Sequence, residues 1–155
     1  MINIKSGNII NAAEDIICHQ VNCLGIMGGG LALQIKNKYP EVFKAYKEFC
    51  PRQKTEQMLG QTQIVACHDG KYIANIFGQN ECGWGKQQTD YDALAQGFNR
   101  LFSAVTNDSK YSDKSIAIPY GIGCGLGGGD WNEVLKIIEK SIKAYDVKNV
   151  VIYKL

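Results

Sequence analysis

Apolar residues recur along this chain with two different spacings. In short stretches they are nearly continuous or alternate with polar residues, which is typical of β-strands; these are residues 16–21, 61–67, 72–77, 115–119 and 149–153. In longer stretches they recur every three or four positions, the period of one helix face; these are residues 31–39, 42–49, 91–105 and 132–145. The pattern predicts strands and helices that alternate along the chain.

Isoleucines mark a further strand at the beginning of the chain. Ile2 and Ile4 alternate with polar residues, and Ile9 and Ile10 follow the pair Gly7-Asn8. Glycine and asparagine favour a turn, so we expect an opening strand that continues past that turn.

The connections between the predicted elements indicate how the sheet is built. Asp69-Gly70 stands between the strands at 61–67 and 72–77, and this dipeptide predicts an antiparallel hairpin. The other strands are mostly separated by helices, which favours parallel neighbours with helices on both faces. We therefore expect an α/β fold of three layers, α/β/α, with a mixed, mostly parallel central sheet formed as a single domain by residues 1–155.

Two glycine clusters lie between a predicted strand and a predicted helix. They are Met27-Gly28-Gly29-Gly30-Leu31-Ala32 and Gly121-Ile122-Gly123-Cys124-Gly125-Leu126-Gly127. Glycine lets the backbone approach a ligand closely, and a helix start offers unpaired N–H groups with partial positive charge. That combination binds phosphate groups. Both loops leave the carboxyl ends of strands, so we expect them side by side around a ligand with two linked phosphates.

The composition and charge of the chain argue against several classes of protein. The 155 residues are 45% hydrophobic, which suits one ordinary globular core. A net charge of +2 with scattered basic residues argues against nucleic-acid binding by charge alone. The chain shows neither a charged-then-apolar leader nor an apolar run of membrane-spanning length, so we expect a cytoplasmic protein with no membrane partner.

Cysteine and histidine usage argues against disulfides and metals. Six cysteines are spread along a chain without a secretory leader, which favours reduced thiols. There is no Cys-x-x-Cys pair, and His19 and His68 have no neighbour at ligand spacing. We expect no metal site and no bound cofactor.

Neither of two common nucleotide-binding motifs is complete in this sequence. Gly123, Gly125 and Gly128 satisfy the G-x-G-x-x-G spacing of nicotinamide-cofactor folds, but the next predicted strand, 149–153, lacks the acidic residue at its end that such folds use. The G-x-x-x-x-G-K-[ST] pattern of P-loops is absent from the sequence. A nicotinamide-dependent oxidoreductase therefore stays a minor alternative.

Ordered motifs along the whole chain resemble the macrodomain family, whose members bind ADP-ribose. The motifs are Gly7-Asn8-Ile9, Cys18-His19-Gln20-Val21-Asn22-Cys23, the Met27 to Ala32 loop, Ile118-Pro119-Tyr120-Gly121-Ile122-Gly123-Cys124-Gly125-Leu126 and Tyr153-Lys154-Leu155. Within the family they are most similar to the branch of terminal ADP-ribose protein glycohydrolase and yeast-type ADP-ribose 1″-phosphate phosphatase. The resemblance implies a mixed sheet between helices, in agreement with the periodicity.

The resemblance also implies where a ligand binds. Asn8 and Ile9, with Leu155 nearby, would contact the adenine, and Asn22 would face the distal ribose. The diphosphate and distal ribose would be wrapped by Met27, Gly28, Gly29, Gly30, Leu31 and Ala32 on one side and by Gly121, Ile122, Gly123, Cys124, Gly125, Leu126 and Gly127 on the other.

The sequence departs from the family pattern at three of these positions. Many macrodomains have Asp where this chain has Asn8, whose neutral carbonyl accepts a weaker hydrogen bond from adenine. The glycohydrolase uses a lysine and an aspartate, and the matching residues here are Gln79 and Gly127. A glutamine is not a competent nucleophile, and glycine offers no acid.

His19 and Asn22 are the candidate catalytic residues. His19 aligns with a histidine of the phosphatase-like relatives, although a strand histidine is often a core residue, and a strand-end asparagine often caps a loop. Asp130 precedes a helix, which favours an N-cap over a catalytic base. Trp84 and Tyr91 either border the cleft or pack beside it.

We expect the chain to bind ADP-ribose or an ADP-ribosylated substrate and to hydrolyse linkages at the distal ribose. Water would be positioned by Asn22, loop amides and the ligand's own phosphate. The alternative is a module that binds ADP-ribose without turning it over. Nucleic acid is expected only as an ADP-ribosylated substrate, and the protein is expected to be a monomer.

Overall fold

The fold is built on one sheet of six strands. The computed structural model describes residues 2–52, 54–83 and 85–155. Its strands are β1 (Asn3–Ser6), β2 (Ile16–Val21), β3 (Thr62–Ala66), β4 (Tyr72–Phe77), β5 (Ile116–Pro119) and β6 (Val150–Lys154), in the order β1-β6-β5-β2-β4-β3. Only β3, the hairpin partner of β4, runs antiparallel to its neighbour. The mixed, mostly parallel sheet expected from the sequence is confirmed.

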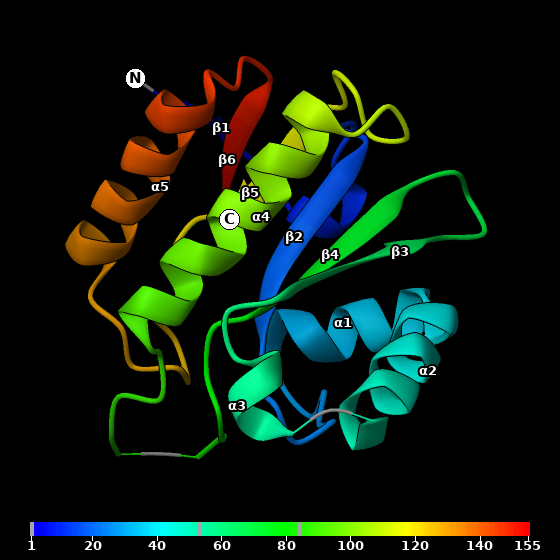
Figure 1. Ribbon diagram of the computed structural model, residues 1–155, viewed down its shortest axis with the longest axis vertical. Helices are drawn as coiled ribbons and strands as arrows, with labels where there is room; N and C mark the ends of the chain where they lie inside the picture. Colours follow the sequence, from blue (N-terminus) through cyan, green and yellow to red (C-terminus); the bar gives the residue numbers. More distant parts are fainter. Residues whose placement is uncertain (1, 53, 84) are drawn as a thin grey trace.

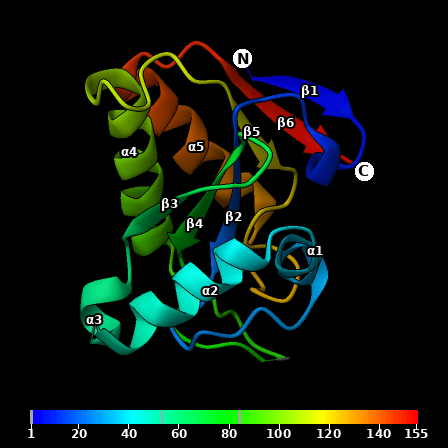
Figure 2. The same cartoon turned by 90° about the vertical axis from the view of Figure 1, so that its right-hand side faces the viewer.

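Helices cover both faces of the sheet. They are α1 (Gly30–Lys38), α2 (Pro40–Phe49), α3 (Thr55–Met58), α4 (Tyr91–Asn107) and α5 (Trp131–Tyr145), with 3-10 helices η1 (Ile9–Asn11) and η2 (Cys50–Arg52). Figures 1 and 2 show α4 and α5 on one face, with α1 and α2 on the other. None of the helices within the described ranges is long and apolar enough to cross a membrane.

Strand β2 contributes side chains to both halves of the hydrophobic core. Its successive side chains point to opposite faces of the sheet, and one half of the core lies on each face. Ile16 and Cys18 belong to the cluster that packs under α4 and α5, whereas Ile17 and Val21 belong to the cluster under α1 and α2. The strand is buried on both faces, which explains its continuous apolar run.

Local sequence signals fix where the helices begin. Pro40 opens α2, a position where its missing N–H costs nothing. Asp90 caps α4 by accepting a hydrogen bond from the Ala93 N–H, and Asp130 caps α5 by accepting one from the Asn132 N–H. The N-cap interpretation of Asp130 is thus confirmed.

The expected continuation of the opening strand past Gly7-Asn8 is wrong. Asn8 accepts a hydrogen bond from the Ile10 N–H through its side chain, and residues Ile9–Asn11 form η1 instead. This local side-chain bond competes with strand pairing. Ile9 is buried because it packs into the core, not because it lies in the sheet.

All six cysteines are free thiols, as the sequence predicts. Cys18, Cys23 and Cys50 are buried, and Cys82 is exposed. Burial raises the pKa of Cys23 to about 11, so this thiol stays protonated at neutral pH.

Candidate functional site

Both glycine loops open into one cavity of about 630 Å³ at the carboxyl edge of the sheet. The cavity lies there because β2 and β5 are parallel neighbours, so the loops that follow them leave the sheet side by side. The two loops approach each other: a Cβ placed on Gly29 would lie 3.5 Å from Leu126 Cδ1. The arrangement expected from the sequence is therefore present.

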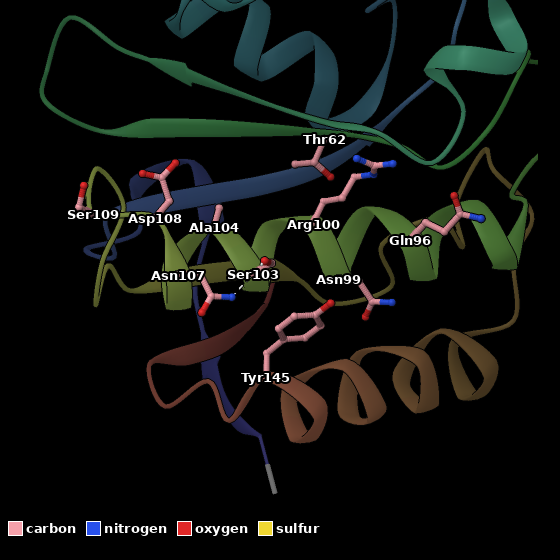
Figure 3. A pocket seen from close by; sticks show the side chains of 10 residues that line it. All are labelled: Thr62, Gln96, Asn99, Arg100, Ser103, Ala104, Asn107, Asp108, Ser109 and Tyr145. Atoms are coloured by element: carbon pink, nitrogen blue, oxygen red, sulfur yellow. Dashed lines mark hydrogen bonds between the residues drawn. The ribbon is translucent and has the colours of Figure 1, made fainter.

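A second cavity, of about 870 Å³, lies along α4 (Figure 3). Its lining includes Thr62, Arg100 and Tyr145, and none of its residues comes from the glycine loops. Ten side chains labelled in Figure 3 line a polar depression against a continuous helix, whose interior N–H groups are already paired. The cavity between the glycine loops is the better candidate for phosphate binding.

Most of the predicted site residues line the cavity between the loops. They are His19, Asn22, Gly28, Gly29, Gly30, Leu31, Ala32, Gly121, Ile122, Gly123, Gly125, Leu126 and Gly127. Sequence reasoning missed Gln20, Val21, Ile26, Cys82, Gly83, Pro119 and Tyr120, and it considered Gln79 only as a departure from the family pattern. Most of these missed residues lie next to a predicted site residue in the sequence, and this proximity is the signal that could have found them.

The remaining predicted residues lie outside this lining. Met27 is buried in the core, and the Cys124 thiol donates to the Ile122 carbonyl. Asn8 and Leu155 follow the ends of the paired strands β1 and β6, where the Gly7 N–H donates to the Lys154 carbonyl at 3.0 Å. The contact of Asn8, Ile9 and Leu155 with adenine stays a prediction.

The cavity wall carries the features of an anion site. Helix α1 begins at Gly30, and its N-cap Gly29 makes no side-chain capping bond, so the helix start keeps unpaired N–H groups. In the opposite loop, Gly121 and Gly123 have φ values of +78° and +74°. Only glycine adopts these angles without strain, and they turn the backbone around the cavity.

The side chain of Asn22 shapes the first loop through hydrogen bonds at both its amide nitrogen and its amide oxygen. Its Nδ2 donates to the Ile26 carbonyl at 2.8 Å, and its Oδ1 accepts from the Leu24 N–H at 3.0 Å and the Tyr46 hydroxyl at 2.7 Å. Asn22 lines the cavity but is only 6% exposed. Its geometry indicates that it fixes the loop in place.

His19 is the buried first member of a polar ladder across β2, β4 and β3. Its Nε2 lies 2.6 Å from Asn75 Oδ1, Asn75 Nδ2 donates to Gln63 Oε1, and Gln63 Nε2 donates to the Ala45 carbonyl of α2. A carbonyl can only accept, so each amide has one possible orientation and His19 must donate from Nε2. His19 Nδ1 then carries the free lone pair, and it is buried without a hydrogen-bond partner.

Burial keeps the imidazole of His19 uncharged. It lowers the pKa of His19 to about 4, against the smaller opposing effect of the Asn75 hydrogen bond. At neutral pH the ring is therefore a hydrogen-bond acceptor at Nδ1 and not a cation.

A second polar network supports the loop after β5. Gln20 Nε2 donates to Gln79 Oε1 at 2.7 Å and to Thr89 Oγ1 at 2.9 Å, and the Thr89 hydroxyl donates to the Gly123 carbonyl at 2.7 Å. Gln79 is thus joined to Gln20, and both residues line the cavity.

The same network accounts for glycine at position 127. A Cβ there would lie 2.6 Å from Thr89 Oγ1 and 2.7 Å from the Gly123 carbonyl oxygen, closer than such atoms pack. An aspartate at this position requires the backbone to move. The structure therefore gives a steric reason for the missing acid of the glycohydrolase pattern.

Of the two aromatic residues considered for the cleft border, one is placed by the structure. The Tyr91 hydroxyl accepts from the Asp130 N–H at 2.9 Å, so this ring packs at the start of α5 and is not part of the cavity lining. Trp84 lies outside the described residues.

Comparison with known proteins identifies the family of this chain. The family model of the Macro domain matches residues 18–138, which include both glycine loops. This chain is a macrodomain. The solved macrodomain of Mycobacterium tuberculosis DarG covers 100% of it with a TM-score of 0.83 at 29% identity, and the chain covers 98% of that structure.

Two curated relatives carry enzyme names. A DNA ADP-ribosyl glycohydrolase of Mycobacterium tuberculosis is 31% identical over 99% of this macrodomain, and an ADP-ribose 1″-phosphate phosphatase of Saccharomyces cerevisiae is 25% identical over 90%. The macrodomain spans 92% of the yeast relative but only 42% of the mycobacterial one. The phosphatase group to which the sequence motifs are similar is thus represented among its relatives, together with glycohydrolases that are named for DNA.

Proposed function

We propose that this macrodomain binds the ADP-ribosyl group and hydrolyses its linkage at the distal ribose. The observation that carries the proposal is the meeting of two glycine loops and the uncapped start of α1 around one cavity. Backbone N–H groups and a helix dipole bind phosphate groups, and a single site of this kind would not distinguish ADP-ribose from other phosphates. Two of them around one cavity suit the diphosphate of ADP-ribose. The enzyme names of the relatives support the same substrate family.

The hydrolytic route must operate without a charged side chain. Among the described lining residues there is no Asp, Glu, Lys or Arg, and Met1, Gln53 and Trp84 have no acidic or basic side chain either. We infer that water attacks the distal ribose C1″ while a phosphate oxygen of the ligand takes its proton. The bond from C1″ to the acceptor breaks, and the electron pair leaves with the acceptor. Phosphate and carboxylate acceptors leave well without protonation, whereas amines and nucleobase nitrogens leave poorly.

A binding module without turnover is the second candidate. It is favoured by Gln79 and Gly127 at the positions of the glycohydrolase lysine and aspartate, and by the hydrogen bonds of the Asn22 side chain within its own loop. In that case the cavity would bind ADP-ribose without hydrolysing any linkage to it.

Turnover of defined conjugates distinguishes the two candidates. ADP-ribose 1″-phosphate, glutamyl-linked ADP-ribose and thymidine-linked ADP-ribose are incubated with the protein, and products are measured by mass spectrometry. We expect hydrolysis of the first two. Asn22→Ala should lower the rate strongly and Gln79→Ala little. Turnover of none of them, together with calorimetric binding of ADP-ribose, would establish the binding module, and a covalent ADP-ribosyl protein would refute the water route.

We further propose that the protein acts in the cytoplasm as a monomer. Six free thiols suit a reducing compartment. Cell fractionation tests the location, and light scattering of the purified protein tests the monomer.

A further inference from the structure

Strand β3 forms one edge of the sheet, and half of its backbone groups point away from the sheet. Its single neighbour is β4, and Figure 1 shows β3 as the outermost strand on that side. The Gln61 carbonyl accepts from the last residue of β4 at 3.0 Å, and the Cys67 N–H donates to the residue before β4 at 2.8 Å. Because antiparallel pairing alternates along a strand, Thr62, Ile64 and Ala66 direct their N–H and C=O groups outward.

The sequence of this edge lacks the features that usually protect an edge strand. Natural edges carry charged residues, proline or a bulge. Residues 57–67 include no Asp, Glu, Lys, Arg or Pro, and the register with β4 runs from Thr62 to Ala66 without a bulge. The opposite edge of the sheet, β1, carries Lys5. The β3 edge is therefore suited to pairing with an added strand.

The cavity of about 870 Å³ along α4 adjoins the beginning of this edge. Thr62 lines the cavity and donates its hydroxyl to the Gly97 carbonyl of α4 at 2.7 Å. Arg100, about one turn later in α4, donates from Nε to the Gly60 carbonyl at 3.1 Å. Figure 3 shows the Arg100 side chain extending from α4 toward β3 at Thr62. The cavity thus places a guanidinium group beside the outward backbone of Thr62.

The positive charge of Arg100 has no acidic partner among the described residues. Its Nη atoms make no hydrogen bond there, and none of the ion pairs includes it. Asp108 is the one acidic residue of the described cavity lining, but it lies at the end of α4, about 12 Å further along the helix. Its Oδ1 accepts from the Lys110 N–H. An acidic side chain from a partner can therefore pair with this guanidinium.

An added antiparallel strand presents alternate side chains to the two sides of the edge. The side chains opposite Thr62 and Ile64 point toward α4, and the residues that carry them are the ones whose backbone bonds to β3. The intervening side chains point toward α2, where Val65 packs on apolar residues. A second copy of this chain offers its own β3, but Thr62–Ala66 contains no acid for Arg100. The edge therefore fits a peptide that is polar and acidic on one face and apolar on the other.

We propose that the β3 edge binds an extended peptide segment of a partner protein. The segment adds to the six-stranded sheet as a further antiparallel strand and places an acidic side chain, opposite Thr62, against Arg100. The described lining of the cavity along α4 shares no residue with that of the cavity between the glycine loops. Peptide binding is therefore independent of ADP-ribose and of the proposed function.

Backbone-methylated peptides test the added strand directly. The probe is the fluorescein-labelled peptide Val-Thr-Val-Glu-Val-Thr-Val, titrated by fluorescence anisotropy. Methylation of its Glu and Thr backbone nitrogens removes the N–H groups that face β3, and we expect binding to weaken by about tenfold or more. Methylation of the last three Val nitrogens, which face away from β3, should leave the affinity within about twofold. Gln in place of Glu should weaken binding about threefold to fivefold at low salt, the size of an exposed ion pair.

Protein variants test the same contacts from the other side. Ala66→Pro removes one outward N–H and keeps the ladder with β4, so we expect a folded protein that binds the peptide about threefold less tightly. Arg100→Gln should bind the Glu and Gln peptides equally. Lys140→Gln, an equal charge change on an exposed lysine of α5, should bind both peptides like the parent protein.

Several results would overturn the proposal. They are no measurable binding of the unmethylated peptide, equal affinities of the two methylated peptides, and equal losses in Arg100→Gln and Lys140→Gln. Displacement of the peptide by saturating ADP-ribose would also overturn it, because the peptide would then occupy the cavity between the glycine loops. A dimer of the parent protein that Ala66→Pro dissociates, measured by light scattering, would show that a second copy covers the edge instead.

Discussion

His19 and Asn75 face each other across β2 and β4 and are joined by a hydrogen bond of 2.6 Å between Nε2 and Oδ1. Gln63 pairs with Asn75 in the same register on β3, and its amide ends the ladder at the Ala45 carbonyl. Three polar side chains are therefore aligned beneath α1 and α2, and their orientation fixes which imidazole nitrogen is free. The tautomer of His19 can therefore be tested by changing the other members of this ladder.

Loss of the hydrogen bond from His19 to this ladder should allow both neutral tautomers of the His19 imidazole. In the parent protein we expect ¹⁵N shifts of a neutral ring protonated on Nε2. Asn75→Leu removes the acceptor and should yield a mixture of tautomers, whereas Gln63→Glu keeps an acceptor for Asn75 Nδ2 and should preserve the parent tautomer. An unchanged tautomer in Asn75→Leu would show that the ladder does not control the ring.

The lowered pKa of His19 predicts a pH dependence of folding. The unfolded histidine binds a proton below about pH 6.5, but the folded one does so only near pH 4. The unfolded state therefore binds more protons in this interval, and stability falls as the pH is lowered through it, by about 3 kcal/mol in total. Urea midpoints between pH 4 and 7.5 measure the slope. His19→Leu should flatten it, and equal slopes in both proteins would contradict the assignment.

The anion site predicts charge-sensitive binding at the glycine loops. Gly29→Glu places a carboxylate at the start of α1, and we expect calorimetry to show ADP-ribose binding weakened by at least tenfold. Gly123→Glu should do the same, with an added loss of stability because φ is +74° there. Gly29→Gln separates charge from bulk, since it should bind more tightly than Gly29→Glu. Parent-like affinity in a folded Gly29→Glu protein would disprove the two-loop site.

The structure predicts that a side chain at position 127 destabilises the fold, whereas a side chain at the nearby Gly125 does not. Gly127→Ala should lower the free energy of unfolding by about 1–3 kcal/mol, because its Cβ would overlap Thr89 Oγ1 and the Gly123 carbonyl. Gly125→Ala is the control, since a Cβ there meets nothing within 4 Å. In a Thr89→Ala background the cost should shrink without vanishing, because the carbonyl remains. Equal thermal stabilities of both single variants would contradict the contact.

The sequence by itself determined the layers and the place of the site. The strand periods, the helix periods and the Asp-Gly turn act over a few residues, so the sheet, the helices and the hairpin followed from them. The glycine loops followed strands directly, and parallel strands end at one edge, which brings Gly29 and Leu126 together. Ile9 and Ile10 were misjudged because the Asn8 capping bond competes with the strand at short range.

Only the tertiary structure decided the chemistry inside the site. The partner of His19 depends on the register of β2, β4 and β3, and the engagement of Asn22 depends on Tyr46 arriving from α2. The reason for Gly127 depends on Thr89, which lies far away in the sequence. The basic residues looked scattered along the chain, and the packing of α1 against α2 gathers Lys36 and Lys47 on one ring. Contacts between distant residues are set by how the layers pack, and a local pattern carries no information on that packing.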